Sequence, residues 1–142
     1  MILRRQVIEE SLDYLGAIVG RLEKLRAADR ERFFNSGDLQ WAAERGLQLG
    51  AQSVLDIGAH ILAGHFGARP ADYEDVIRLL AAHGVMSPGL ESRLRGLGGF
   101  RNILVHGYRE IDEAKVYDFL QHDSAVFRDF ANAVEAWLAG TD

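Results

Sequence analysis

Apolar residues recur along this chain at alternating spacings of three and four, which is the period of an amphipathic helix. The first such stretch runs from Leu3 to Arg26. The second runs from Leu39 to Ala63, and its stripe includes small residues that would let another helix approach closely. The two stripes consist of Ile8, Leu12, Leu15, Val19 and Leu22, and of Ala43, Leu47, Gly50, Val54, Ile57 and Ile61. No stretch shows the period of two that is typical of strands, so the pattern predicts two long helices.

Capping residues, glycine and proline divide the remainder of the chain. A shorter helix is expected from Ala71 to Ala82. Ser87-Pro88 is typical of an N-cap and a first-turn proline, and the helix that follows is weakened at Gly98-Gly99. Asp112 is a good cap for a last helix from Glu113 to Leu138. The buried stripes of these last two helices are expected to hold Leu90, Leu94, Leu97, Val116, Leu120, Phe127, Phe130, Val134 and Trp137.

These elements predict an all-α fold, an antiparallel helical bundle of four long helices plus one short helix. The length of 142 residues suits a single domain over residues 1–142. Trp41 and Trp137 are expected to pack inside the bundle.

Composition narrows the class of protein further. The chain is 48% apolar with a net charge of −5, which is ordinary for a globular protein and argues against a general coat for nucleic acids. No apolar stretch approaches the length of a membrane span, and the absence of cysteine excludes disulfides and thiolate sites, so we expect a cytoplasmic protein with no membrane association. His60 and His65 lie five apart, which is not the spacing of a helical zinc pair, so we expect no metal and no cofactor.

The charge is unevenly distributed. Between Ser87 and Arg109 the chain carries Arg93, Arg95, Arg101 and Arg109 against one acid, Glu91. This basic strip predicts a confined anion site, in which Arg93, Arg95 and Arg109 are candidates for binding the phosphates of RNA. The alternative is an ordinary solvated helix face.

The run from Phe100 to Tyr108 holds the side chains best suited to catalysis. Arg101 can hold a phosphate by paired charged hydrogen bonds, and His106 can move a proton near neutral pH. On an unbroken helix, residues five apart point about 140° away from each other. Either the helix ends between Arg101 and His106, near Gly107, or two copies of the motif meet across a two-fold axis.

The string Arg-Asn-x-x-Val-His-x-Tyr, formed by Arg101, Asn102, Val105, His106 and Tyr108, resembles the core motif of the HEPN superfamily. More narrowly it is similar to the HepT branch, the toxins that are partnered with a minimal nucleotidyltransferase antitoxin. The run Arg45-Gly46-Leu47-Gln48 looks like that branch's second-helix signature, and the resemblance extends over most of the chain.

The resemblance implies a homodimeric toxin of a toxin–antitoxin pair that cleaves RNA, with transfer RNA among the candidate substrates, at a composite cleft between two copies. Arg101 and His106 would be the catalytic residues, with Asn102 in support. No metal is required if the ribose 2′-hydroxyl attacks, which leaves a 2′,3′-cyclic phosphate. Tyr108 matches the tyrosine that the nucleotidyltransferase partner modifies by adenylylation.

Two other interpretations stay open. The chain could be a non-catalytic helical partner of a nucleotidyltransferase that binds a nucleotide or a protein. In that case Arg101 would bind phosphate and His106 would cap a helix end. The chain could also be a purely structural helical dimer in which neither residue matters.

Overall fold

The computed structural model describes residues 4–106 and 111–141, and it describes side chains at residues 4–97 and 111–141. The described residues form seven α-helices and no strand. In chain order these helices are α1 (Arg5–Arg26), α2 (Arg30–Phe34), α3 (Gly37–Phe66), α4 (Tyr73–Ala82), α5 (Pro88–His106), α6 (Glu113–His122) and α7 (Val126–Ala139). The predicted all-α bundle is therefore confirmed, although the chain is divided more finely than the apolar pattern indicates.

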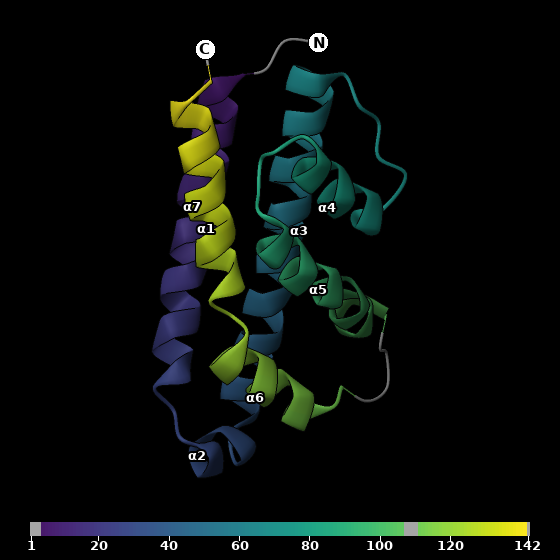
Figure 1. Cartoon of the computed structure of the whole chain (residues 1–142). Coiled ribbons are helices and arrows are strands. Elements are labelled where there is room, and N and C mark those ends of the chain that lie inside the picture. Colours follow the sequence, from purple (N-terminus) through teal and green to yellow (C-terminus); the bar gives the residue numbers. More distant parts are fainter. Residues whose placement is uncertain (1–3, 107–110, 142) are drawn as a thin grey trace.

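The helices α1, α3 and α7 run along the length of the molecule, while α4 and α5 lie to one side and α2 and α6 close one end (Figure 1). The start of α1 and the end of α7 lie together at the other end, where Arg5 Nη1 donates to the carbonyl of Leu138 at 2.9 Å. Every residue of the two predicted aliphatic stripes is buried, and together they form the middle of one core.

Small residues on α3 let its neighbours approach closely, as the pattern predicts. A Cβ atom at Gly50 would lie 2.8 Å from the Phe127 ring of α7, and one at Gly46 would lie 2.8 Å from Leu22 Cδ2 of α1. Ordinary side chains at these positions would separate the helices, because core contacts are already close-packed. Glycine therefore brings α1 and α7 into direct contact with α3.

The prediction of one last helix from Glu113 to Leu138 was wrong. The chain turns at residues 123–125, where the buried Ser124 donates its hydroxyl to the carbonyl of Leu120 at 2.6 Å and α7 begins at Val126. Leu120 and Phe127 are both fully buried and lie seven positions apart, so the apolar period continues in phase across the turn. Periodicity alone could not reveal it.

The short helix α2 was not predicted. Asp29 caps it by accepting from the N–H of Arg32 at 2.7 Å, and Phe33 is buried against Tyr117 of α6 with ring centroids 5.2 Å apart. Five residues are too few to display a helical period, so only the tertiary contact with α6 shows this element.

The two tryptophans differ in their environments. Trp137 packs against the core and meets His65 edge-on at 5.0 Å, as expected. Trp41 was predicted to pack inside the bundle and this was wrong, because 75% of it is exposed on α3. Within residues 4–106 and 111–141, no helix combines the length and the apolar character needed to cross a membrane.

Candidate active site

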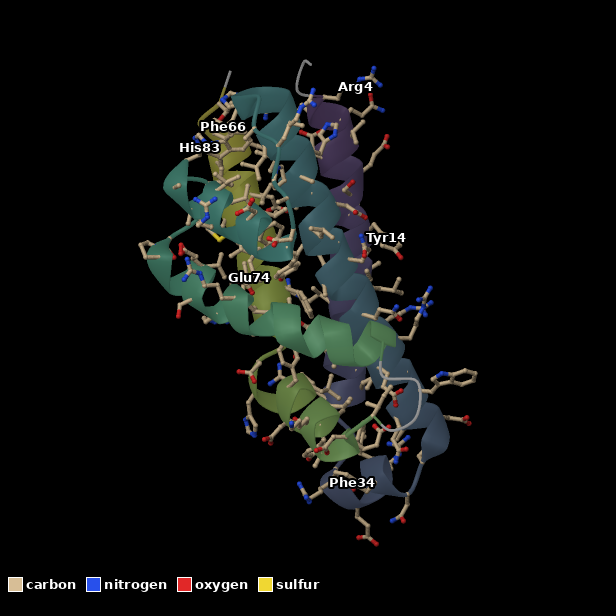
Figure 2. All side chains as sticks on the ribbon, turned by 90° about the vertical axis from the view of Figure 1, so that its right-hand side faces the viewer. Arg4, Tyr14, Phe34, Phe66, Glu74 and His83 are labelled. Carbon is tan, nitrogen blue, oxygen red and sulfur yellow. The ribbon has the colours of Figure 1, made fainter. Side chains whose placement is uncertain are left out.

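The helix α5 begins as its sequence predicts. Ser87 Oγ accepts from the N–H of Leu90 at 3.1 Å, and Pro88 is the first helical residue. The buried residues Leu90, Leu94 and Leu97 attach this helix to α3 and α4. The hydroxyl of Tyr73 on α4 also reaches the carbonyl of Leu94, at 3.4 Å. The first half of α5 is therefore held in place by the core, and in Figure 2 the helix crosses α3 at a steep angle.

The helical backbone of α5 continues through Gly98-Gly99 to His106. Arg101, Asn102 and His106 therefore belong to the same helix as the buried leucines. This excludes the alternative in which the helix ends between Arg101 and His106. Ideal helix geometry then separates these two positions by about 140° around the axis. Tyr108 and Arg109 lie outside the described residues.

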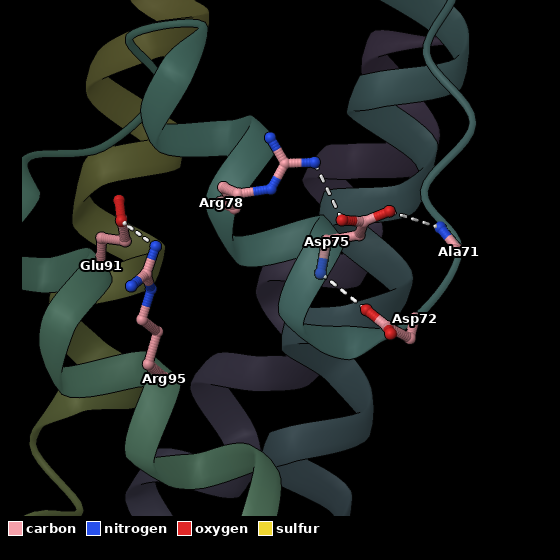
Figure 3. A network of polar contacts seen from close by, with 6 residues as sticks. All are labelled: Ala71, Asp72, Asp75, Arg78, Glu91 and Arg95. Carbon is pink, nitrogen blue, oxygen red and sulfur yellow. Dashed lines mark hydrogen bonds and ion pairs between the residues drawn. The ribbon is translucent and has the colours of Figure 1, made fainter.

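Two arginines of the predicted phosphate-binding set have partners of their own. Arg95 Nη2 lies 2.8 Å from Glu91 Oε1 one turn earlier on α5 (Figure 3), and Arg93 Nη1 lies 2.7 Å from Asp129 Oδ2 on α7. Both pairs are about half exposed on the arginine side. Since exposed pairs contribute only about 0–1 kcal/mol, these arginines can still exchange a carboxylate for a phosphate.

A wide hollow lies at the start of α5. It has a volume of about 940 Å³ and is lined by the start of α5 and by α7, including Arg93, Asp129 and Trp137. The motif lies at the opposite end of α5. Arg93 and Asp129 are the charged residues of this lining, and they pair with each other.

At the start of α4 the carboxylates of the first turn accept hydrogen bonds from backbone and side-chain groups (Figure 3). Asp72 Oδ1 accepts from the N–H of Asp75 at 2.8 Å, and Asp75 itself accepts from the N–H of Ala71 and from Arg78. The hydrogen bond from Ala71, followed by that from Arg78, lowers the pKa of Asp75. These carboxylates therefore cap and stabilise a helix start, and no group of three or more metal-ligating side chains occurs among the described residues.

A pair of carboxyl groups lies where the chain re-enters the bundle after the motif. Asp112 caps α6 by accepting from the N–H groups of Ala114 and Lys115. The next residue, Glu113, faces Glu44 of α3, and its Oε2 atom is buried without a hydrogen-bond partner among the described residues. Burial first, and then the neighbouring Glu44 carboxyl, raise the pKa of Glu113 to about 7.

Sequence reasoning missed this Glu44–Glu113 pair. Glu44 immediately precedes the run Arg45-Gly46-Leu47-Gln48, and Glu113 follows a recognisable cap, but nothing in the local pattern connects the two residues. Within that run Leu47 is fully buried and Arg45 Nη1 donates to Gln48 Oε1 at 3.2 Å. The pair lies near the motif in sequence, since six residues separate His106 from Glu113.

The fold and the motif helix define an all-helical protein with an arginine–histidine motif in the last turns of α5. The model of the ribonuclease HepT-like family matches residues 8–134 of this chain. The chain therefore belongs to that family.

Curated relatives agree with this assignment. The tRNA nuclease HepT of Aphanizomenon flos-aquae is 31% identical over 112 residues, which cover 78% of this chain and 76% of that protein. The mRNA nuclease HepT of Shewanella oneidensis is 29% identical over 108 residues, which cover 76% of this chain and 81% of that protein.

Solved structures share the fold. The tri-AMPylated Shewanella oneidensis HEPN toxin in complex with the MNT antitoxin superposes with a TM-score of 0.84 at 25% identity, over 94% of this chain and 99% of that chain. The cytosolic protein YutE of Bacillus subtilis reaches a TM-score of 0.84 at 21% identity, over 99% of this chain and 94% of that chain, which is a likeness of fold alone. The predicted HEPN-like architecture of the HepT branch is thus confirmed.

Proposed function

We propose that this protein is the toxin of a toxin–antitoxin pair and a metal-independent endoribonuclease, with Arg101 and His106 as its catalytic residues. The observation that carries the proposal is the placement of both residues on one continuous helix, α5, in a chain of the ribonuclease HepT-like family. The two curated relatives named as RNA nucleases support the activity.

The mechanism follows from the chemistry of RNA and of these side chains. His106 removes the proton from the ribose 2′-hydroxyl or protonates the departing 5′-oxygen, because an imidazole can accept or donate a proton near neutral pH. Arg101 stabilises the charge that develops on the phosphate oxygens. The 2′-oxygen forms a new bond to phosphorus while the bond to the 5′-oxygen breaks. The products are a 2′,3′-cyclic phosphate and a 5′-hydroxyl, and Asn102 supports the arrangement.

The catalytic cleft forms between two copies of the chain. Arg101 and His106 are separated by about 140° around α5, so a composite site pairs the arginine of one copy with the histidine of the other. A two-fold axis brings the same patch of both copies together and supplies this arrangement without further elements. Arg93, Arg95 and Arg109 bind flanking phosphates in this scheme.

The antitoxin is a minimal nucleotidyltransferase that adenylylates Tyr108. The solved complex of an AMPylated HEPN toxin with its MNT antitoxin supports this partner. Tyr108 lies two positions beyond His106, so a bulky anionic group attached there would occupy the phosphate site and repel RNA.

The test is RNA cleavage by purified protein in excess EDTA, with transfer RNA among the substrates and with product ends mapped. We expect wild type to leave cyclic phosphate ends, and Arg101→Ala and His106→Ala to lose at least 100-fold in rate. Arg78→Ala and His122→Ala are matched controls, since both side chains are exposed on other helices, and they should retain wild-type rates.

The alternative function is that of a non-catalytic helical partner of a nucleotidyltransferase. It would be indicated if folded wild-type protein, unmodified at Tyr108, left every RNA intact. Cleavage that persists in His106→Ala would instead move the catalytic role to another residue.

A further inference from the structure

An open groove follows the seam between α1 and α3. Its floor is apolar, formed by Ile18 and Leu25 of α1 and by Ala42 and Leu49 of α3, and its volume is about 400 Å³. At Ala42 it joins a second hollow of about 450 Å³, which is lined by Trp41. We call this continuous feature the basic groove.

Three cations line the basic groove: Arg21 and Lys24 from α1 and Arg45 from α3. All three are exposed, and within the described part of the chain none of them forms an ion pair with a carboxylate. The single acid that lines either hollow is Asp38. In a protein of net charge −5, three uncompensated cations around one groove are a local site for an anion.

The aromatic residue at the end of the groove is the exposed Trp41, 75% of which is accessible to solvent. Cations that follow a backbone, combined with an exposed aromatic face on which bases stack, are how proteins bind single-stranded nucleic acid without reading its sequence. An indole left in water has no role in the bundle core, so this side chain is available for stacking.

A short path of chain connects the basic groove to the motif. Arg45 is adjacent in sequence to Glu44, whose carboxyl faces Glu113, and Glu113 follows His106 by seven residues, or at most about 25 Å of extended chain. The next hollow along the seam, beyond Leu49, is lined by Glu10, Tyr14 and Asp56. Its carboxylates disfavour a polyanion, so a strand in the basic groove extends toward α5 rather than along the whole seam.

We propose that the basic groove binds single-stranded RNA flanking the cleavage site, with a base stacked on Trp41 and phosphates held by Arg21, Lys24 and Arg45. This inference rests on the proposed function in taking RNA as the substrate. It adds residues from α1 and α3 to a proposed site whose other residues come from Arg93 to Arg109.

The test measures binding separately from cleavage. The probe is a short fluorescein-labelled oligouridylate of about ten nucleotides with 2′-O-methyl groups, which lacks the nucleophile of the cleavage reaction. We expect Trp41→Ala to weaken binding about tenfold or more through lost stacking. The triple variant R21Q/K24Q/R45Q should reduce the slope of log Kd against log salt by about 2, since single strands release about 0.7 counterions for each phosphate contact.

Matched controls separate the groove from general effects of charge and surface. The triple variant R32Q/R78Q/R128Q removes the same number of positive charges from α2, α4 and α7, none of which lines the basic groove. Tyr14→Ala removes an exposed aromatic residue from the acidic hollow, where the side chain projects from α1 in Figure 2. Both controls should bind the probe as wild type does. Quenching of tryptophan fluorescence by the probe should disappear in Trp41→Phe and persist in Trp137→Phe.

Equal affinities for the groove variants and their controls would overturn the inference. A loss of the assembled mass in light scattering on Trp41→Ala would overturn it too, because the face would then be an interface between protein chains. If wild type binds through the groove yet cleaves no RNA, the groove remains an RNA-binding site, and the proposed nuclease falls together with the cleavage site that the groove would flank. If cleavage depends on His106 while binding ignores the groove, only the inference falls.

Discussion

The chemical environment of Glu113 is created by a residue of another helix. Its carboxyl is half-buried at the start of α6 and faces Glu44 of α3, and it has a pKa raised to about 7. A carboxyl with a raised pKa keeps its proton in the folded state at a pH where the unfolded chain has lost it. Folding is therefore favoured at low pH at this position, and the two carboxylates repel each other when both are ionised.

We expect Glu113→Gln to remove a pH dependence of stability. Between pH 4.5 and about 7, the ordinary and the raised pKa, Glu113 should make wild type lose stability as pH rises, whereas the glutamine variant has no titrating group at this position. The melting temperatures of the two proteins should be similar near about pH 5 and should differ most above about pH 7, with the variant more stable. Thermal unfolding followed by circular dichroism measures this difference.

Glu9→Gln on the exposed face of α1 is the matched control, and its melting temperature should follow that of wild type at each pH. A constant offset between wild type and Glu113→Gln over the whole range would show that Glu113 does not titrate in this window.

Among the helices, α3 decides how closely the others pack. Its residues Gly46, Gly50 and Gly58 face α1, α7 and α4, and the ring of Phe127 occupies the space where Gly50 would carry a Cβ. The glycines at Gly16 and Gly20 of α1 differ, since a Cβ there would meet nothing within 4 Å. The same residue type therefore has opposite energetic effects at the two kinds of position.

We expect Gly50→Ala to destabilise the fold by about 1–3 kcal/mol, because the added methyl displaces a fully buried ring in a close-packed core. The matched control Gly16→Ala should stabilise it by about 0.5–1 kcal/mol through reduced backbone entropy of the unfolded chain. Urea unfolding at equilibrium gives both free energies. A stabilising Gly50→Ala would show that α7 moves away from α3 at little cost.

For the whole molecule, the continuity of α5 raises the question of whether Arg101 and His106 act within one chain or across two chains. One helix separates the positions of Arg101 and His106 by about 140°, and the proposed site therefore pairs groups from two chains. Subunit mixing tests this directly, because a composite site and a site within one chain give opposite results.

We expect mixed dimers of co-expressed Arg101→Ala and His106→Ala chains to recover about half of wild-type RNA cleavage, since each mixed dimer keeps one of the two composite sites intact. Each variant expressed alone should be inactive. The measurement is cleavage in EDTA by protein purified through two different tags. A mixed dimer without activity would mean that Arg101 and His106 act within one chain.

Much of this protein can be inferred from local sequence, and the remainder cannot. The apolar period determined the helical class and the stripes of α1 and α3, and the capping residues Ser87 and Asp112 marked two helix starts. Each of these signals depends on residues within a few positions of one another. The motif string predicted the family, and the match over residues 8–134 confirms it.

The tertiary structure alone decided the features that depend on residues far apart in the chain. The turn before α7 keeps the apolar period in phase, Arg93 meets an acid on α7, and the pKa of Glu113 is raised by burial and by a carboxyl of α3. The exposure of Trp41 follows from which face of α3 remains uncovered after α1 has packed on the helix. A one-dimensional pattern reports the period of a helix, but the neighbours of each face, and therefore its charge and solvation, are set by the packing of distant elements.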